Sequence, residues 1–312
     1  MSHCKRPAKP CDTLKYLRLH AREDNLSISA TTADLSLRGE CCLPGRSIMA
    51  TKLVRALNSH PLRLAHLFSR KEIAEMPRDP LQSATPVLRG AEIACVYYGQ
   101  RMAGDFYEFL RVSPTRVLFV LLDIAGRREN TREVLIAAQD AFRNAASKLF
   151  SRGDFNETVA MTELCGVLNR TILQVAGVRS CPAVLGCYNE ELGTVCYANA
   201  GHPPALLRDA QGIASLPATG LPFGLFTHAP HSASTCHLVP GAVLLLISRG
   251  VLEAEGDEEE FGLEGAQEAL RQSTASSARD VCLDILYSVQ RFMNRPPTHN
   301  DLTAMSLLRC AG

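Results

Sequence analysis

The pattern of apolar and polar residues changes near residue 85. Before that point the pattern is mixed and predicts only short helices. Pro77 and Pro80 interrupt the last of these helices and predict a linker. We therefore expect a basic N-terminal region over residues 1–80, partly disordered or in short helices, and a folded domain over residues 85–309. The short helices are expected at Ser47–Ala56 and Leu62–Met76.

The folded domain combines strand patterns with helix patterns. Runs rich in Val, Leu and aromatic residues predict strands, and apolar residues at helical spacing between Val134 and Leu149 predict a helix. Strands, then helices, then strands joined by short turns are typical of an α+β sandwich with antiparallel sheets. The expected strands are Glu92–Tyr98, Arg116–Ile124, Ala183–Tyr188, Thr194–Asn199, Pro204–Arg208, Ala242–Ser248 and Leu302–Arg309, and the further helices are Glu157–Gln174 and Ala278–Phe292.

Composition narrows the class of protein. With 46% hydrophobic and 21% charged residues, the chain can bury a sizeable core. The longest apolar runs, Val117–Leu122 and Ala242–Ile247, are far shorter than the roughly 20 residues of a transmembrane helix. The basic N-terminus lacks the apolar stretch of a secretory signal, so we expect a cytoplasmic protein with no transmembrane segment. No glycine-rich nucleotide-binding loop occurs, which argues against a doubly wound nucleotide fold.

The twelve cysteines are expected to be free thiols. No CxxC pair occurs, and the adjacent Cys41 and Cys42 have the wrong spacing for a tetrahedral zinc site. A cytoplasmic location would also keep thiols reduced. Several cysteines lie within apolar patterns, as small buried side chains do, namely Cys95, Cys187, Cys196 and Cys282.

The charge is unevenly distributed along the chain. Residues 1–85 carry 14 Lys and Arg against 8 Asp and Glu, a net charge of +6. The remainder carries 19 against 24, a net charge of −5. A basic N-terminal region could bind an acidic partner or a membrane surface, or could be a solvated tail. No nucleic-acid partner is predicted, and a dimer is compatible with the sequence.

Two aspartates stand where catalytic carboxylates often lie. Asp105 follows Gly104 in the segment Ala-Gly-Asp-Phe-Tyr-Glu, and Asp123 ends an apolar run and precedes Ile124. A charge directly after a buried strand is costly unless it is paired or binds a metal ion. Carboxylate oxygens suit hard cations such as Mg²⁺ or Mn²⁺. Taken singly, such aspartates also occur as turn or cap residues.

The histidines give weaker signals. His202, in Asn-Ala-Gly-His-Pro-Pro, is expected in a turn between strands, with a structural role. His228, His231 and His237 have a spacing that fits neither a helical nor a hairpin zinc site, so we expect them in a solvated loop.

Six segments in order give the chain a family resemblance. They resemble the GGDFYDF, DVSG, YANAGHPPPLL, G-x-PLG, L-x-PGD-x-LLLYTDGVTEA and DDxTLLVLR motifs of the SpoIIE-type branch of the PPM (PP2C-like) serine/threonine phosphatases. Together they span about 225 residues of the chain. The matching segments are Ala103–Phe109, Leu122–Gly126, Tyr197–Leu207, Thr219–Leu225, Leu238–Ala254 and Asn300–Arg309.

The resemblance implies an αββα sandwich with a two-metal centre at one edge of the paired sheets. In that family the ions activate a water that attacks the phosphorus of a phosphoserine. Carried over by position, Asp105 would bind one ion, and Asp123 would bridge both, with the Ile124 carbonyl as a further ligand. The implied substrate is a phosphorylated Ser or Thr on a small regulatory protein, such as an anti-sigma-factor antagonist.

The chain departs from the family pattern at the metal ligands. Arg249 replaces the Asp of TDG, and Asn300 aligns with the first Asp of DDxT, unless a one-residue slip brings in Asp301 instead. Arg128 stands where the family has Gly. Four carboxylates with charge −4 thus become two carboxylates and an arginine with charge −1. Arginine offers no lone pair to a metal ion, so we expect one Mg²⁺ or Mn²⁺ ion at most.

These substitutions leave three possibilities open. The domain is a pseudophosphatase that binds a regulatory partner, or a weak one-metal enzyme in which Arg249 substitutes for the missing cation. In the third, neighbouring acids such as Asp301 or Glu253 rebuild the metal centre.

Overall fold

The computed structural model describes residues 84–98, 104–124, 128–151, 155–175, 180–257, 259–293 and 301–311, without the side chains of residues 128–130. By its contacts the chain divides into two units, Met1–Glu75 and Met76–Gly312, and every described residue belongs to the second. The short helices, the disorder and the linker expected before residue 81 therefore lie outside the described residues.

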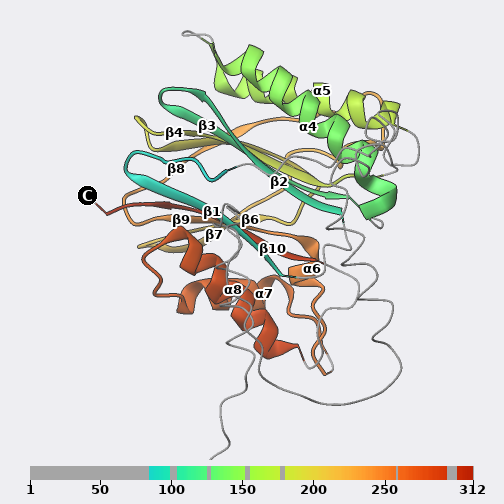
Figure 1. The fold of residues 1–312 in the computed structure, drawn as a ribbon. Helices are drawn as coiled ribbons and strands as arrows, with labels where there is room; N and C mark the ends of the chain where they lie inside the picture. The colour runs from blue at the N-terminus through green and yellow to red at the C-terminus, as the bar shows by residue number, and fades with distance from the viewer. Residues whose placement is uncertain are drawn as a thin grey trace, which may run out of the picture. The chain divides into compact units, whose positions relative to one another are not determined.

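Two antiparallel sheets of five strands each form the centre of the domain (Figure 1). In spatial order, the first sheet contains β1 (Ala91–Tyr98), β10 (Leu302–Arg309), β9 (Val243–Ile247), β6 (Ala205–Asp209) and β7 (Gly212–Leu216). The second contains β2 (Gly104–Ser113), β3 (Arg116–Ile124), β4 (Ala183–Asn189), β5 (Thr194–Ala200) and β8 (Ser234–His237).

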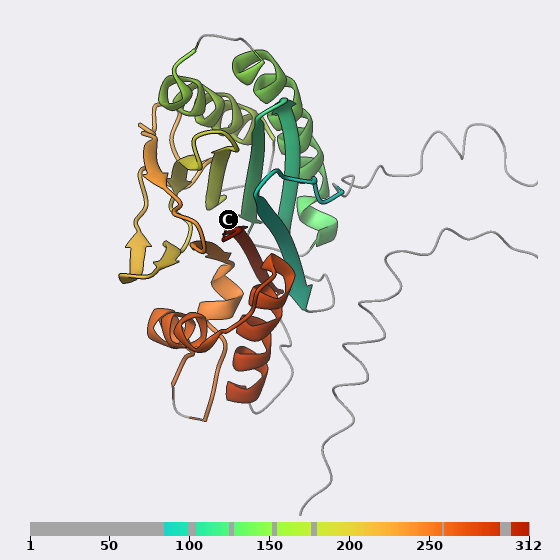
Figure 2. The same ribbon diagram turned by 90° about the vertical axis from the view of Figure 1, so that its left-hand side faces the viewer.

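Helices cover the outer face of each sheet (Figures 1 and 2). Helices α4 (Arg128–Phe150) and α5 (Glu157–Gln174) lie on the second sheet, and α7 (Gly262–Gln272) and α8 (Ala278–Phe292) lie on the first. A short helix, α6 (Arg249–Leu252), follows β9 directly. The layers thus run helix, sheet, sheet, helix, which confirms the predicted αββα sandwich. No helix in the described part of the chain is long and apolar enough to cross a membrane.

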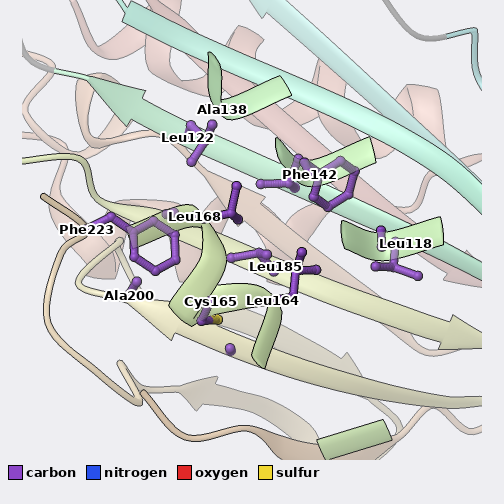
Figure 3. Packing of buried hydrophobic residues seen from close by; sticks show 14 of the residues in the cluster. Leu118, Leu122, Ala138, Phe142, Leu164, Cys165, Leu168, Leu185, Ala200 and Phe223 are labelled. Atoms are coloured by element: carbon purple, nitrogen blue, oxygen red, sulfur yellow. The ribbon is translucent and has the colours of Figure 1, made fainter. Parts of the chain in front are cut away.

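Three apolar layers fill the spaces between these elements. One lies between the second sheet and its helices and includes Leu118, Phe142 and Leu164 (Figure 3). A second lies between the two sheets and includes Phe119 and Leu121, and a third lies under α7 and α8. Because successive residues of β3 point alternately into the first and second layers, the whole strand is apolar. Burial of each Leu or Phe contributes about 1.5–3 kcal/mol.

Every strand and helix predicted for the folded domain is present, and the bounds of β3, α5, α8 and β10 agree with those predicted. The structure adds β2, β7, β8, α6 and α7. β2 carries the charged Glu108, which is buried in an ion pair with Arg143 of α4. The prediction for His237 is wrong, because it lies on β8 instead of in a loop. The eight cysteines described are free, and Cys187, Cys196 and Cys282 are buried as expected.

Candidate active site

Asp105 and Asp123 lie directly opposite each other on the neighbouring strands β2 and β3. The next pair in the same register is Gly104 and Ile124. A side-chain Cβ at Gly104 would lie 2.1 Å from the Ile124 carbonyl oxygen, a distance that no real Cβ tolerates. Glycine at this position therefore allows the β2 backbone to approach the Ile124 carbonyl closely.

Asp105 is a buried carboxyl that is expensive to ionise. Its pKa is raised from 3.8 to about 7, chiefly by burial and in part by the nearby Asp123. The Thr303 hydroxyl donates to Asp105 Oδ2 at 2.6 Å and opposes this shift, as does the Ser248 hydroxyl. Thr303 is on β10 of the first sheet, so this hydrogen bond joins the two sheets at the site.

The Ser248 side chain fixes the ends of β9 and β10 beside Asp105. Ser248 N–H donates to the Thr303 carbonyl at 2.9 Å, and Thr303 N–H donates to Ser248 Oγ at 3.0 Å. Ser248 Oγ also donates to the Asp301 carbonyl at 3.3 Å. Asp301 is buried, and its charge is among those that raise the pKa of Asp105. Asn300, the other candidate at this end of β10, lies outside the described residues.

Asp123 is influenced by a neighbouring cation. Burial raises its pKa, and the Arg249 guanidinium and backbone N–H lower it, whereas Glu253 raises it. Arg249 Nε lies 3.6 Å from Asp123 Oδ2 and 3.5 Å from Glu253 Oε1, and the Arg249 side chain is 47% exposed. The structure thus brings Arg249 to Asp123, at the first residue of α6. Both contacts are ion pairs, longer than a typical hydrogen bond.

The sequence did not reveal that His202 is related to the site. It is 4% exposed, and its burial lowers its pKa from 6.5 to about 4, with the Arg249 charge as a further cause. The turn role expected from Asn-Ala-Gly-His-Pro-Pro holds, because His202 N–H donates to Asn199 Oδ1 at 2.8 Å. No local motif indicates that this histidine is buried or that the Arg249 charge acts on it.

The oxygen donors suit a hard cation only in part. The carboxylates of Asp105 and Asp123 and the Ile124 carbonyl are the ligands that Mg²⁺ and Mn²⁺ prefer. Within the described ranges, however, no three side chains of His, Cys, Asp or Glu are grouped to hold a metal ion. Asp105, Asp123 and the Ile124 carbonyl therefore remain the candidate ligands for a hard cation in the part of the chain that the structure describes.

The family model for stage II sporulation protein E (SpoIIE) matches residues 113–309. This chain belongs to the SpoIIE family. The match includes Asp123, Arg249 and Asp301, and Asp105 lies just before it.

One relative of known activity is similar to half of this chain. The phosphoserine phosphatase RsbP of Bacillus subtilis is 26% identical over 161 residues, which cover 50% of this chain and 39% of RsbP. This chain thus matches well under half of that relative's length.

Two solved structures share the αββα sandwich. The PP2C phosphatase domain and regulatory fragment of B. subtilis SpoIIE has a TM-score of 0.59 at 14% identity, covering 71% of this chain and 64% of that one. The SiaA PP2C domain of Pseudomonas aeruginosa has a TM-score of 0.59 at 15% identity, covering 84% and 98%. The fold is therefore that of the PP2C-type phosphatases found in bacterial signalling regulators.

Proposed function

We propose that this SpoIIE-family domain is a protein serine/threonine phosphatase with an altered metal centre. It acts in the cytoplasm on a phosphorylated Ser or Thr of a small regulatory protein, of the anti-sigma-factor-antagonist kind. Family membership and the similarity to the phosphoserine phosphatase RsbP support the reaction class. The observation that carries the altered centre is the position of Arg249 Nε, 3.6 Å from Asp123 Oδ2, where the family resemblance implies a second metal ligand.

In this proposal the metal centre is reduced to one position. Asp105, Asp123 and the Ile124 carbonyl would hold a single Mg²⁺ or Mn²⁺ ion. A bound ion of this kind lowers the pKa of a coordinated water and so supplies a nucleophile near neutral pH. Because the pKa of Asp105 is raised to about 7, chiefly by burial, ion binding at neutral pH would compete with protonation of that carboxyl.

Arg249 substitutes for the second cation. Its guanidinium presents N–H groups in a planar fork that matches two phosphate oxygens, and its half-exposed position leaves it accessible to a phosphoprotein. Placed beside the attacked phosphoryl group, this positive charge would stabilise the negative charge that develops there.

A second candidate function is a non-catalytic binding module for the same kind of partner. The observation that favours it is the lack, within the described ranges, of a group of three metal-binding side chains. Arg249 would then bind the phosphate, and no hydrolysis would follow.

Manganese-dependent hydrolysis separates these candidates. We would compare the natural chain, Asp123→Ala, and the double reversion Arg249→Asp with Asn300→Asp, using p-nitrophenyl phosphate and a phosphorylated protein. Turnover by the natural chain that disappears in Asp123→Ala supports the phosphatase. Turnover only in the double reversion supports the binding module. If no variant turns over either substrate, the assignment of these residues to a metal centre is wrong.

A further inference from the structure

Large apolar side chains gather on the loop that joins β7 to β8. Three of the seven that are exposed in the described part of the chain lie within six residues of this loop, Leu221 at 46%, Leu225 at 38% and Phe226 at 59%. Residues 210–248 contain no Asp, Glu, Lys or Arg. Single exposed apolar residues are normal, whereas a gathered group indicates an interaction site. These three side chains form the apolar loop surface.

Buried contacts hold the backbone of this loop. Asn169 of α5 is 2% exposed, and its side-chain amide accepts the Gly224 N–H and donates to the Phe226 carbonyl, both at 2.9 Å. Phe223 is fully buried in the layer between the second sheet and its helices (Figure 3). The His231 ring packs on Phe223, with ring centres 5.0 Å apart. The apolar loop surface is therefore preorganised, so little conformational entropy is lost when a partner binds it.

The loop lies beside the candidate active site. Phe223 and Cys181 exchange both of their backbone hydrogen bonds, at 2.8 and 3.0 Å. The next residue, Pro182, accepts the Asp123 N–H at 2.9 Å. Because hydrogen-bonded strands lie about 4.8 Å apart, two such steps place Phe223 about 10 Å from Asp123. An extended chain advances about 3.4 Å per residue, so residues about three to five positions from a phosphoserine at Asp123 reach the apolar loop surface.

We propose that the apolar loop surface binds large apolar side chains that lie near the phosphorylated Ser or Thr of the protein substrate. This inference rests on the proposed function, because the phosphorylated residue must reach Asp105 and Asp123. A substrate chain that continues past Asp123 meets a neighbouring surface that is apolar and uncharged. Apolar side chains are buried favourably there, whereas charged ones would lose hydration without gaining a partner. The surface thus selects the substrate and takes no part in the reaction itself.

Binding of two synthetic phosphoserine peptides to the full chain tests the proposal. The peptides are identical except that the positions three to five residues on each side of the phosphoserine carry Leu and Phe in the apolar peptide and Ser in the serine peptide. By fluorescence anisotropy, we expect the natural chain to bind the apolar peptide at least about tenfold more tightly, the effect of burying one large apolar side chain. Equal affinity for the two peptides, or binding of neither, would overturn the proposal.

Two variants locate the preference on the loop. The double substitution Leu225→Ser with Phe226→Ser removes exposed side chains and keeps the backbone contacts of Asn169, so the preference should fall below about threefold. Leu192→Ser is a matched control that should keep the preference, because Leu192 is 62% exposed in the turn between β4 and β5, at their other end. Equal affinity of all three proteins for the serine peptide shows that the site is folded.

A double variant that keeps the natural preference contradicts the proposal. If the double variant does not fold, Phe226→Ser alone removes the most exposed of the three side chains and gives the same test. A dimer of the natural chain that the double variant loses, in sedimentation velocity, would show that a second copy covers the surface and would also overturn the proposal.

The unphosphorylated apolar peptide separates this inference from the proposed function. We expect it to bind at least about tenfold more weakly than the phosphorylated form, because it lacks hydrogen bonds to a charged group. If the natural chain binds both forms equally, the apolar loop surface stands and the proposed function fails. If it binds both phosphorylated peptides equally and the unphosphorylated one more weakly, the proposed function stands and this inference fails.

Discussion

At the scale of single residues, the chemistry depends on two buried carboxyl groups that face each other. Asp105 and Asp123 are paired across β2 and β3, and burial raises the pKa of both. Like charges directly opposite each other destabilise a sheet. A cation between them, or the nearby Arg249, relieves this repulsion.

The pKa of Asp105 predicts how the metal-free protein responds to pH. Its folded pKa of about 7 exceeds its usual 3.8, so between these values the folded state binds more protons than the unfolded state. The free energy of unfolding therefore falls as pH rises from about 4 to about 7, by on the order of 4 kcal/mol for this group. Asp105→Asn removes the titration, so it should stabilise the chain at pH 8 and change little at pH 4.

Urea unfolding in the presence of a chelator, at a series of pH values, measures this difference. If the free energy of unfolding changes with pH in parallel for the natural chain and Asp105→Asn, the pKa of Asp105 is not raised in the folded state, which contradicts the prediction. Adding Mn²⁺ at pH 8 should restore stability to the natural chain and not to the variant.

Gly104 permits the close approach of the Ile124 carbonyl, so Gly104→Ala should destabilise the fold. The added Cβ would meet backbone at 2.1 Å, and the two strands must move apart, at a cost of about 1–3 kcal/mol. Gly166, inside helix α5, is a matched control because an added Cβ there meets only the end of the Arg170 side chain, at 3.3 Å. Gly166→Ala should stabilise by roughly 0.5–1 kcal/mol. Equal effects of the two substitutions in chemical denaturation would contradict the close approach.

At the scale of elements, the periodicity of apolar residues predicted the buried strands and helices but missed three other strands. Buried residues form continuous apolar runs or recur at helical spacing in β3, α5, α8 and β10. Such patterns can be recognised directly in the sequence. β2 was missed because Glu108 interrupts its pattern, and only the tertiary contact with Arg143 shows why a charge can lie there. β7 and β8 are short edge strands with mostly exposed residues, so their patterns are weak.

The Glu108–Arg143 pair should therefore be needed to dock α4 on β2. Arg143→Ala leaves the buried Glu108 carboxylate without this cation and should lower the free energy of unfolding by about 2–3 kcal/mol. The double substitution Glu108→Gln with Arg143→Met removes both charges and should recover most of the loss. A double-mutant cycle that finds no coupling between the two positions would show that the pair does not stabilise the docking.

At the scale of the whole molecule, the αββα layers bring together residues from distant parts of the chain. Asp105 and Asp123 come from adjacent strands of one sheet, so their convergence could be predicted from the order of the motifs. Arg249 was placed beside them by the family resemblance, and the ion pair with Asp123 agrees with that placement. His202 could not be placed from the sequence, because no local pattern shows that it is buried where the Arg249 charge acts on it.

The proposed function requires a metal centre of reduced capacity, in which Arg249 stands at one of two ion positions. Manganese titration of the natural chain, followed by electron paramagnetic resonance, tests this most directly. We expect at most one Mn²⁺ per chain with the spectrum of an isolated ion, and two coupled ions in the double reversion Arg249→Asp with Asn300→Asp. A spin-coupled pair of manganese ions in the natural chain would contradict the central claim.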